Sequence, residues 1–321
     1  TYSIKDPDIK NALKSIKGHD EKFQKTLKET KSVLAVFGSL VPTKGTYNRK
    51  GKARIFAKGG NVKNYVYNYK HSLGSIPILE KNSKGLGSIN YITQNDAVVR
   101  SLPMIMVFNN KLFPSFGLEM IRVGEKKRSI ITNLNDSGIK NVSIKPYEFK
   151  TDKNSLIWVK YNRSINDNFI SAEKVFNNEF DNKFFRDKYV LIGASAKGLF
   201  DTVKIPTGET VPGVQVHANV IDNLLKNNFL KRNDEIFIFE LIVSILISIV
   251  AFVISQRIKP KYSLSIIFIG LIIIFVIGLI IYKFRSELID VSYPMIMISI
   301  TFLTGLYFRF LQENKIALQN L

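Results

Sequence analysis

The pattern of apolar and polar positions divides the chain into two parts. Three long apolar runs occupy the last third, at Ile236–Ile254, Leu264–Tyr282 and Val291–Phe308, and no run of that length precedes them. At about 1.5 Å of rise per helical residue, each run approaches the ~30 Å hydrocarbon core of a bilayer. The pattern therefore predicts a water-facing domain over residues 1–232 and three transmembrane helices within residues 233–309.

Shorter patterns in the first part predict its fold class. Lys188–Ser195 (KYVLIGAS) is almost continuously apolar, which is typical of a central strand buried on both faces. Gly213–Lys226 is an amphipathic helix with Val216, Val220 and Leu224 on its inner face. Strands, glycine-rich turns and helices in this order predict an α/β domain, a mixed sheet with flanking helices, followed by a three-helix transmembrane bundle.

The charges of the two loops between the apolar runs predict the topology. The first loop carries Arg257, Lys259 and Lys261 and no acidic residue, whereas the second, residues 283–290, has two basic and two acidic residues. The positive-inside rule places the first loop in the cytoplasm. Three spans then put residues 1–232 outside the cytoplasm and the C-terminus inside.

The composition of the chain excludes several kinds of site and makes some classes of partner unfavourable. The 321 residues contain no cysteine, which excludes disulfides, thiolate metal sites and cysteine nucleophiles. No His/Asp/Glu set has the spacing of metal ligands, so we expect no metal or other cofactor. The net charge of +20 comes from lysines scattered among asparagines. Without a dense basic stripe we expect no nucleic-acid partner, and attraction to anionic lipid headgroups is the better interpretation.

Residues 189–225 hold most of the candidate chemistry, and one interpretation is a phosphate loop. Gly193 and Gly198 follow the predicted strand at the spacing of a Walker motif. The lysine and hydroxyl residue that should follow Gly198, and that meet the terminal phosphates and the metal, are absent.

A second interpretation is a serine hydrolase. Ser195, Asp201 and His217 occur in the chain order of the α/β-hydrolases, and Ser195 ends the predicted strand. However, Lys197 stands where the nucleophile elbow requires its second glycine. The three residues are also crowded into 23 positions, which is short for that fold.

A third interpretation is a ligand-binding turn. Backbone amides around Gly193–Gly198 and at the N-terminus of the Gly213 helix could receive an anion, with Asp201 and His217 at the same mouth. The alternative is purely structural, with glycines in tight turns and His217 bonded to a strand end. The candidate ligand-binding residues are Gly193, Ser195, Gly198, Asp201, Gly213, His217 and Asn219.

The membrane part contains one candidate for signal transmission and one ionisable residue near a span end. Residues 310–321 place Leu311, Asn314, Leu318 and Leu321 at spacings of 3, 4 and 3, which is an a/d seam. It predicts the start of a cytoplasmic coiled-coil linker that joins two subunits, with an exposed helix end as the alternative. Glu240 lies near the start of the first span, and we expect it to reach the lipid headgroups.

Three separated motifs occur in the order found in one family of receptors. They are GLGSINYITQNDAVVRSLPMIMVFNNKLFPSFGLEMIR, FRDKYVLIGASAKGLFD and IPTGETVPGVQVHANVIDNLL, and the three spans follow them. Over Pro77–Leu321 the chain resembles the CHASE (type 2) extracellular sensory domain. That family usually begins with an N-terminal span and an early strand with an Ile-Asp pair. Neither is visible here, and no output domain follows, so we expect a fragment truncated at both ends.

The resemblance implies a sensory module of a bacterial inner-membrane receptor. Residues 1–232 would sense an unidentified extracytoplasmic signal and, as part of a homodimer, pass it to an output domain in the same full-length chain. In the family that output is commonly a class III adenylate or guanylate cyclase, and less often a histidine kinase, diguanylate cyclase or protein kinase. No catalytic activity is expected in this segment. The alternatives are an exported, membrane-anchored serine hydrolase and a membrane-anchored assembly protein.

Overall fold

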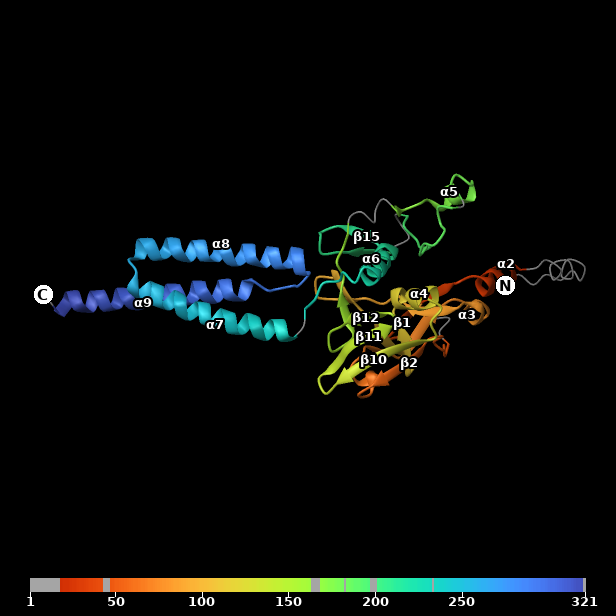
Figure 1. Ribbon diagram of the computed structural model, residues 1–321, viewed down its shortest axis with the longest axis horizontal. Coiled ribbons are helices and arrows are strands. Elements are labelled where there is room, and N and C mark those ends of the chain that lie inside the picture. The colour runs from red at the N-terminus through yellow and green to blue at the C-terminus, as the bar shows by residue number, and fades with distance from the viewer. Residues whose placement is uncertain are drawn as a thin grey trace, which may run out of the picture. The chain divides into compact units, whose positions relative to one another are not determined.

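A computed structural model describes residues 18–42, 47–162, 168–181, 183–196, 201–232 and 234–319. The chain divides into two compact units, Thr1–Phe229 and Leu230–Leu321 (Figure 1). The first contains mixed sheets with flanking helices, and the second contains three long apolar helices. The predicted fold class is therefore confirmed.

One sheet of the first unit has the order β4-β1-β5, with β4 (His71–Gly74) antiparallel and β5 (Gly85–Ser88) parallel to β1 (Val33–Ser39). Helix α4 (Phe116–Gly124) packs on β5, and the Ser115 side chain caps it by accepting a hydrogen bond from the Leu118 amide. The approach is close because β5 contains glycine: a Cβ added at Gly87 would lie 2.5 Å from the Phe116 Cα.

A second sheet has the order β12-β11-β10-β2 and lies on one side of the unit (Figure 1). Its core strand β10 alternates between buried and half-exposed positions, as expected for a sheet with one face in the core. The strands are β2 (Arg54–Lys58), β10 (Ser129–Asn135), β11 (Gly138–Ile144) and β12 (Tyr147–Lys150).

Short strands complete the unit around the shared core. They form the sheets β13-β7-β6 and β3-β8-β9 and the hairpin β14-β15. The hairpin between β8 and β9 turns at Asn109 and Asn110, both with positive φ, as a two-residue turn of this hand requires. The strands are β3 (Asn68–Tyr69), β6 (Ile92–Thr93), β7 (Val99–Pro103), β8 (Ile105–Phe108), β9 (Lys111–Pro114), β13 (Leu156–Trp158), β14 (Thr202–Lys204) and β15 (Thr210–Pro212).

Helix α6 (Gly213–Leu225) confirms the amphipathic prediction. Val216, Val220 and Leu224 are completely buried, and α6 packs against α4. The described residues of this unit also form α2 (His19–Glu29), the 3₁₀ turn η1 (Val62–Asn64), α3 (Pro77–Asn82) and α5 (Ala172–Phe176).

The predicted central strand at Lys188–Ser195 is wrong. The segment forms no strand with any described part of the chain, and Ile192 is 98% exposed. A strand needs backbone hydrogen bonds to a neighbouring strand as well as apolar side chains, and none of the described strands pairs with this segment. Packing holds the segment instead: Tyr189 fits against the bare Cα of Gly124, and Gly193 lies against Val214.

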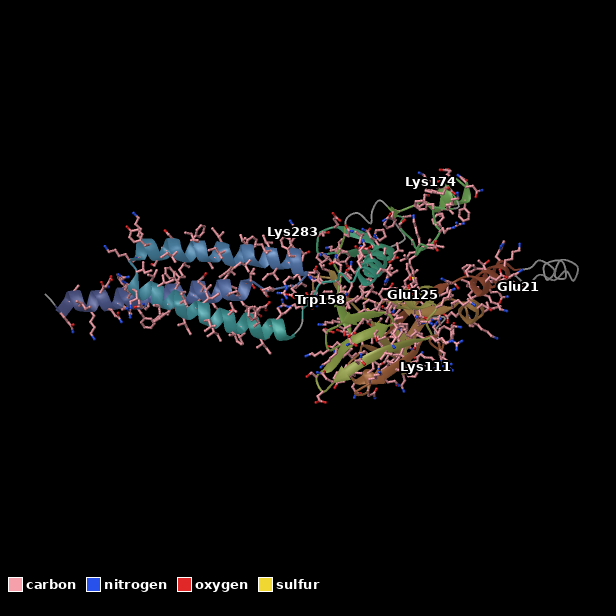
Figure 2. The ribbon with its side chains drawn as sticks, viewed as in Figure 1. Glu21, Lys111, Glu125, Trp158, Lys174 and Lys283 are labelled. Atoms are coloured by element: carbon pink, nitrogen blue, oxygen red, sulfur yellow. The ribbon has the colours of Figure 1, made fainter. Side chains whose placement is uncertain are left out.

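The second unit consists of α7 (Asp234–Arg257), α8 (Pro260–Arg285) and α9 (Ser292–Gln319), which lie side by side (Figure 1). Each is long and apolar enough to cross a membrane, with mean hydropathies of 2.9, 3.3 and 1.5. Side chains along the middle of the three helices are almost entirely carbon (Figure 2). Helix α9 continues without a break through the predicted linker as far as Gln319.

A small residue allows α7 and α9 to approach closely. The Gln256 side chain donates a hydrogen bond to the Gly305 carbonyl at 2.6 Å, and a Cβ at Gly305 would overlap Ser255. Ala251, Ile298 and Phe302 form the apolar contact beside it. Small residues at such positions let membrane helices pack backbone to backbone.

Candidate functional site

A cavity of about 260 Å³ lies in the first unit at the N-terminus of α6. Its apolar walls come from β1, the start of α4 and the extended 188–196 segment. Its polar groups come from Tyr91, Asp201 and His217. The complete lining is Ala35, Phe37, Ile89, Tyr91, Phe116, Leu191, Ile192, Gly193, Asp201, Gly213, Val214 and His217.

His217 is the most deeply placed polar group of the cavity. Its side chain is only 6% exposed, and the Phe116 ring meets it edge-on with centroids 5.7 Å apart. Burial lowers the pKa of His217 to about 4, and a hydrogen bond to the Ile89 backbone opposes that shift only in part. The imidazole is therefore neutral at pH 7. Among the described residues, its Nδ1 atom has no hydrogen-bond partner, so an acceptor is buried at the cavity wall.

Asp201 covers the start of α6. Its backbone carbonyl accepts a hydrogen bond from the Gly213 amide at 2.9 Å. Its carboxylate lies against the Gly213 Cα so closely that a Cβ at Gly213 would overlap Oδ1. The helix has no side-chain cap, and a carboxylate here interacts favourably with the positive end of the helix dipole.

Tyr91 completes the polar part of the cavity. Burial raises the pKa of Tyr91, and the negative charge of Asp201 raises it further, so the phenol stays protonated at neutral pH. The cavity thus presents a carboxylate, a neutral imidazole acceptor and a phenol within apolar walls.

The structure brings together four of the seven predicted ligand-binding residues. Gly193, Asp201, Gly213 and His217 all line the cavity. Ser195 is exposed and does not line it, and Gly198 lies outside the described residues. Within the described part of the chain, no hydrogen bond joins Ser195 to His217, as the hydrolase interpretation would require.

Asn219, the seventh predicted residue, faces another part of the fold. Its Oδ1 accepts a hydrogen bond from the Asn162 amide at 2.8 Å, and its Nδ2 donates to the Gln215 carbonyl. One turn later Asn223 makes the same kind of contact with Lys160. These two asparagines hold the chain after β13 against α6. Two asparagines four residues apart on the inner face of an amphipathic helix are the sequence signal for this role.

Comparison with protein families decides the assignment of the chain. The model of the CHASE2 domain matches residues 3–255, well over half of the sequence. The chain belongs to the CHASE2 family. The match begins far upstream of the residues that carried the resemblance and ends within α7, so α8 and α9 lie beyond it. No curated protein and no solved structure matches this CHASE2 chain.

The second unit contains a polar cluster at the end of the bundle where α7 and α9 begin. Glu240 of α7 is 4% exposed, and its Oε1 accepts a hydrogen bond from the Asp290 amide at 2.6 Å. The Arg232 guanidinium lies 3.5 Å from Glu240 Oε2 and donates to the Leu288 carbonyl at 3.1 Å. We call Arg232, Glu240, Leu288 and Asp290 the membrane-edge clamp. The expectation that Glu240 reaches the lipid headgroups is wrong, because the α8–α9 loop covers it.

Backbone contacts strengthen the membrane-edge clamp. The Lys231 amide donates to the Ser286 carbonyl at 2.8 Å, and the Leu288 amide donates to the Lys231 carbonyl at 2.9 Å. The chain that enters α7 is therefore bonded to the loop that enters α9. Sequence reasoning missed this contact because its partners lie about 50 positions apart.

Proposed function

We propose that this chain is the sensory module of a bacterial transmembrane receptor. The CHASE2 domain lies outside the cytoplasm, and a change in its state passes through the three helices to a cytoplasmic output domain. The membrane-edge clamp is the observation that carries this proposal. Helix α6 lines the cavity and ends at Leu225, and Lys231, the first residue bonded to the α8–α9 loop, follows six residues later.

The clamp gives the signal a physical route within the second unit. A shift of Lys231 and Arg232 displaces the α8–α9 loop through two backbone hydrogen bonds and the Arg232–Leu288 bond. Helix α9 starts directly after that loop and runs to Gln319 as one helix. Because helices are stiff, a displacement at the first turn of α9 reaches its other end.

Charges at the opposite end of the bundle support the proposed topology. Arg257, Lys259 and Lys261 belong to the α7–α8 connection, and the Arg309 side chain donates to the Ile258 carbonyl at 2.5 Å. Four basic residues therefore gather where α7 ends and α9 leaves the apolar region. The positive-inside rule places this end in the cytoplasm and the membrane-edge clamp outside.

The exposed end of α9 supports a dimeric output. The Leu311 side chain is 43% exposed and that of Leu318 is 74% exposed, so these two positions of the predicted seam are open in the single chain. Leu321, the last predicted seam position, lies outside the described residues. Pairing of two seams covers these leucines and brings two output domains together. A class III adenylate or guanylate cyclase, which works as a pair of catalytic domains, is the output that the family favours.

A fusion of residues 1–321 to a class III cyclase domain tests the proposal. We expect cyclic-nucleotide production by the fusion in bacterial membranes to change when Arg232→Ala removes the clamp. Arg285→Ala is the matched control, because Arg285 lies at the same end of the bundle with a 71% exposed side chain. Equal cyclase activity for the fusion, its Arg232→Ala variant and its Arg285→Ala variant would refute the proposed coupling.

A further inference from the structure

The charge at the mouth of the α6 cavity determines which ligands it can accept. A helix N-terminus ordinarily favours an anion. Here the Asp201 carboxylate already lies against Gly213 at that position, and the Asp201 carbonyl accepts a hydrogen bond from the Gly213 amide. A second anion would therefore meet a carboxylate of like charge. The anion-binding role expected for this turn is unfavourable.

The interior of the cavity offers a second, independent indication of a ligand. His217 lines the cavity, is more than nine-tenths buried, and has no partner for Nδ1 in the part of the chain that the structure describes. A buried acceptor without a partner costs free energy, which a ligand donor would recover. The group that satisfies it must carry an N–H or O–H.

The walls of the cavity suit a positive charge attached to an apolar body. Phe37, Tyr91 and Phe116 bring three aromatic rings to the lining, and Leu191 and Val214 add aliphatic surface. Aromatic faces attract ammonium groups, and the interaction strengthens where water is excluded. At about 260 Å³ the cavity is slightly smaller than the ~300–1,000 Å³ of sites for drug-sized ligands.

We propose that the α6 cavity binds a small organic ammonium ion with an apolar body. Asp201 balances the charge, His217 Nδ1 accepts one N–H, and the aromatic walls hold the remainder. This assignment rests on the proposed sensory function, since it names the class of signal for that same site.

Three probes of similar size and different charge test the assignment. Calorimetric titration of the complete chain in lipid nanodiscs compares 2-phenylethylammonium, neutral 2-phenylethanol and 3-phenylpropanoate. We expect the ammonium ion to bind at least about tenfold more tightly than the alcohol, and the carboxylate not to bind. This comparison needs no substitution, so it does not depend on the folding of any variant.

Substitution then assigns the charge preference to one residue. Asp201 is exposed, so Asp201→Asn should leave the fold intact. We expect it to weaken the binding of 2-phenylethylammonium about tenfold and to leave the binding of 2-phenylethanol unchanged. Asp136→Asn, an exposed aspartate in the turn between β10 and β11, is the control and should change neither.

Several results would overturn the assignment. They are tighter binding of the carboxylate than of the ammonium ion, equal binding of all three probes, no effect of Asp201→Asn, or no binding of any probe at millimolar concentration. The cyclase fusion separates these failures from failure of the receptor proposal. If Arg232→Ala still changes cyclic-nucleotide production while the ammonium ion does not bind, the receptor proposal is retained and the proposed ligand class is rejected.

Discussion

The side chain of Asn223 forms hydrogen bonds with both the backbone amide and the backbone carbonyl of Lys160. Its Oδ1 accepts from the Lys160 amide at 2.7 Å, and its Nδ2 donates to the Lys160 carbonyl at 2.9 Å. The amide side chain thus replaces one rung of a sheet ladder, and it fixes the chain after β13 to the helix that lines the cavity. This contact and the one from Asn219 set the position of α6.

Asn223→Ala tests this anchor. The substitution removes two side-chain hydrogen bonds to the Lys160 backbone, so we expect the sensory domain to lose about 2 kcal/mol of unfolding free energy. Fluorescence of Trp158, which lies on the adjacent strand β13 (Figure 2), reports the transition. The exposed Asn64→Ala is the control. Equal transitions for both variants would show that the anchor contributes nothing.

The buried ion pair of α4 gives a second prediction. Arg122 binds both carboxylate oxygens of Glu119 at 2.6 and 2.7 Å, and Glu119 also accepts from the Leu86 amide of β5. Burial raises the pKa of Glu119, and the guanidinium opposes that shift. Glu119→Ala leaves a buried guanidinium without its counter-ion, so we expect a loss of about 3–5 kcal/mol in chemical unfolding.

An exposed pair of the same kind provides the comparison. Asp96 and Arg100 approach to 2.6 Å but remain in contact with solvent. Water and salt screen exposed pairs, so Asp96→Ala should destabilise the domain much less than Glu119→Ala. A larger loss for Asp96→Ala would contradict the assignment of the α4 pair to the core.

His217 predicts a pH dependence of stability. Its pKa is about 4 in the folded domain, below the ~6.5 of an unfolded chain, so the unfolded state binds the proton first as the pH falls. The associated stability is complete above about pH 6.5 and is lost as the pH falls towards 4, by on the order of 3 kcal/mol. Asp201 and Tyr91 are the other titratable groups that line this cavity.

Thermal unfolding between pH 7 and pH 4 measures the effect. His217→Gln removes the titrating group, and we expect its unfolding midpoint to fall less steeply with decreasing pH than that of the unmodified chain. His71→Gln, which removes a histidine of strand β4 outside the cavity lining, is the control for loss of a histidine as such. A slope for His217→Gln as steep as the original would show that His217 does not supply the pH dependence.

The sequence was sufficient where the signal is local. The length and hydropathy of the spans and the inner face of α6 depend only on spacing along the chain, and the structure confirms both. The mixed α/β fold class followed from the same reasoning. Local patterns were also sufficient to predict that Gly193, Asp201, Gly213 and His217 lie together, because a turn and the helix that follows it line the same cavity.

The sequence was insufficient where distant partners decide. Lys188–Ser195 has the composition of a central strand, but a strand also requires a partner from a distant part of the chain, and none of the described strands pairs with it. Burial of Glu240 depends on the Asp290 amide, which no local pattern reveals. The aromatic walls contributed by Phe37 and Phe116 come from segments about 180 and 100 residues before His217, respectively.

The membrane-edge clamp leads to a prediction for α9. The chain has no cysteine, so single cysteines at Leu311 and Ile316 report the pairing of two α9 helices without background. Both side chains are exposed in the single chain, at 43% and 57%, but only Leu311 belongs to the seam. In membranes Leu311→Cys should form disulfide-linked dimers faster than Ile316→Cys.

The rate of Leu311→Cys crosslinking, with and without Arg232→Ala, tests the central claim most directly. If the clamp sets the position of α9, Arg232→Ala changes the ratio of the Leu311→Cys to the Ile316→Cys rate, and Arg285→Ala does not. An unchanged ratio in the Arg232→Ala chain would contradict transmission through the clamp.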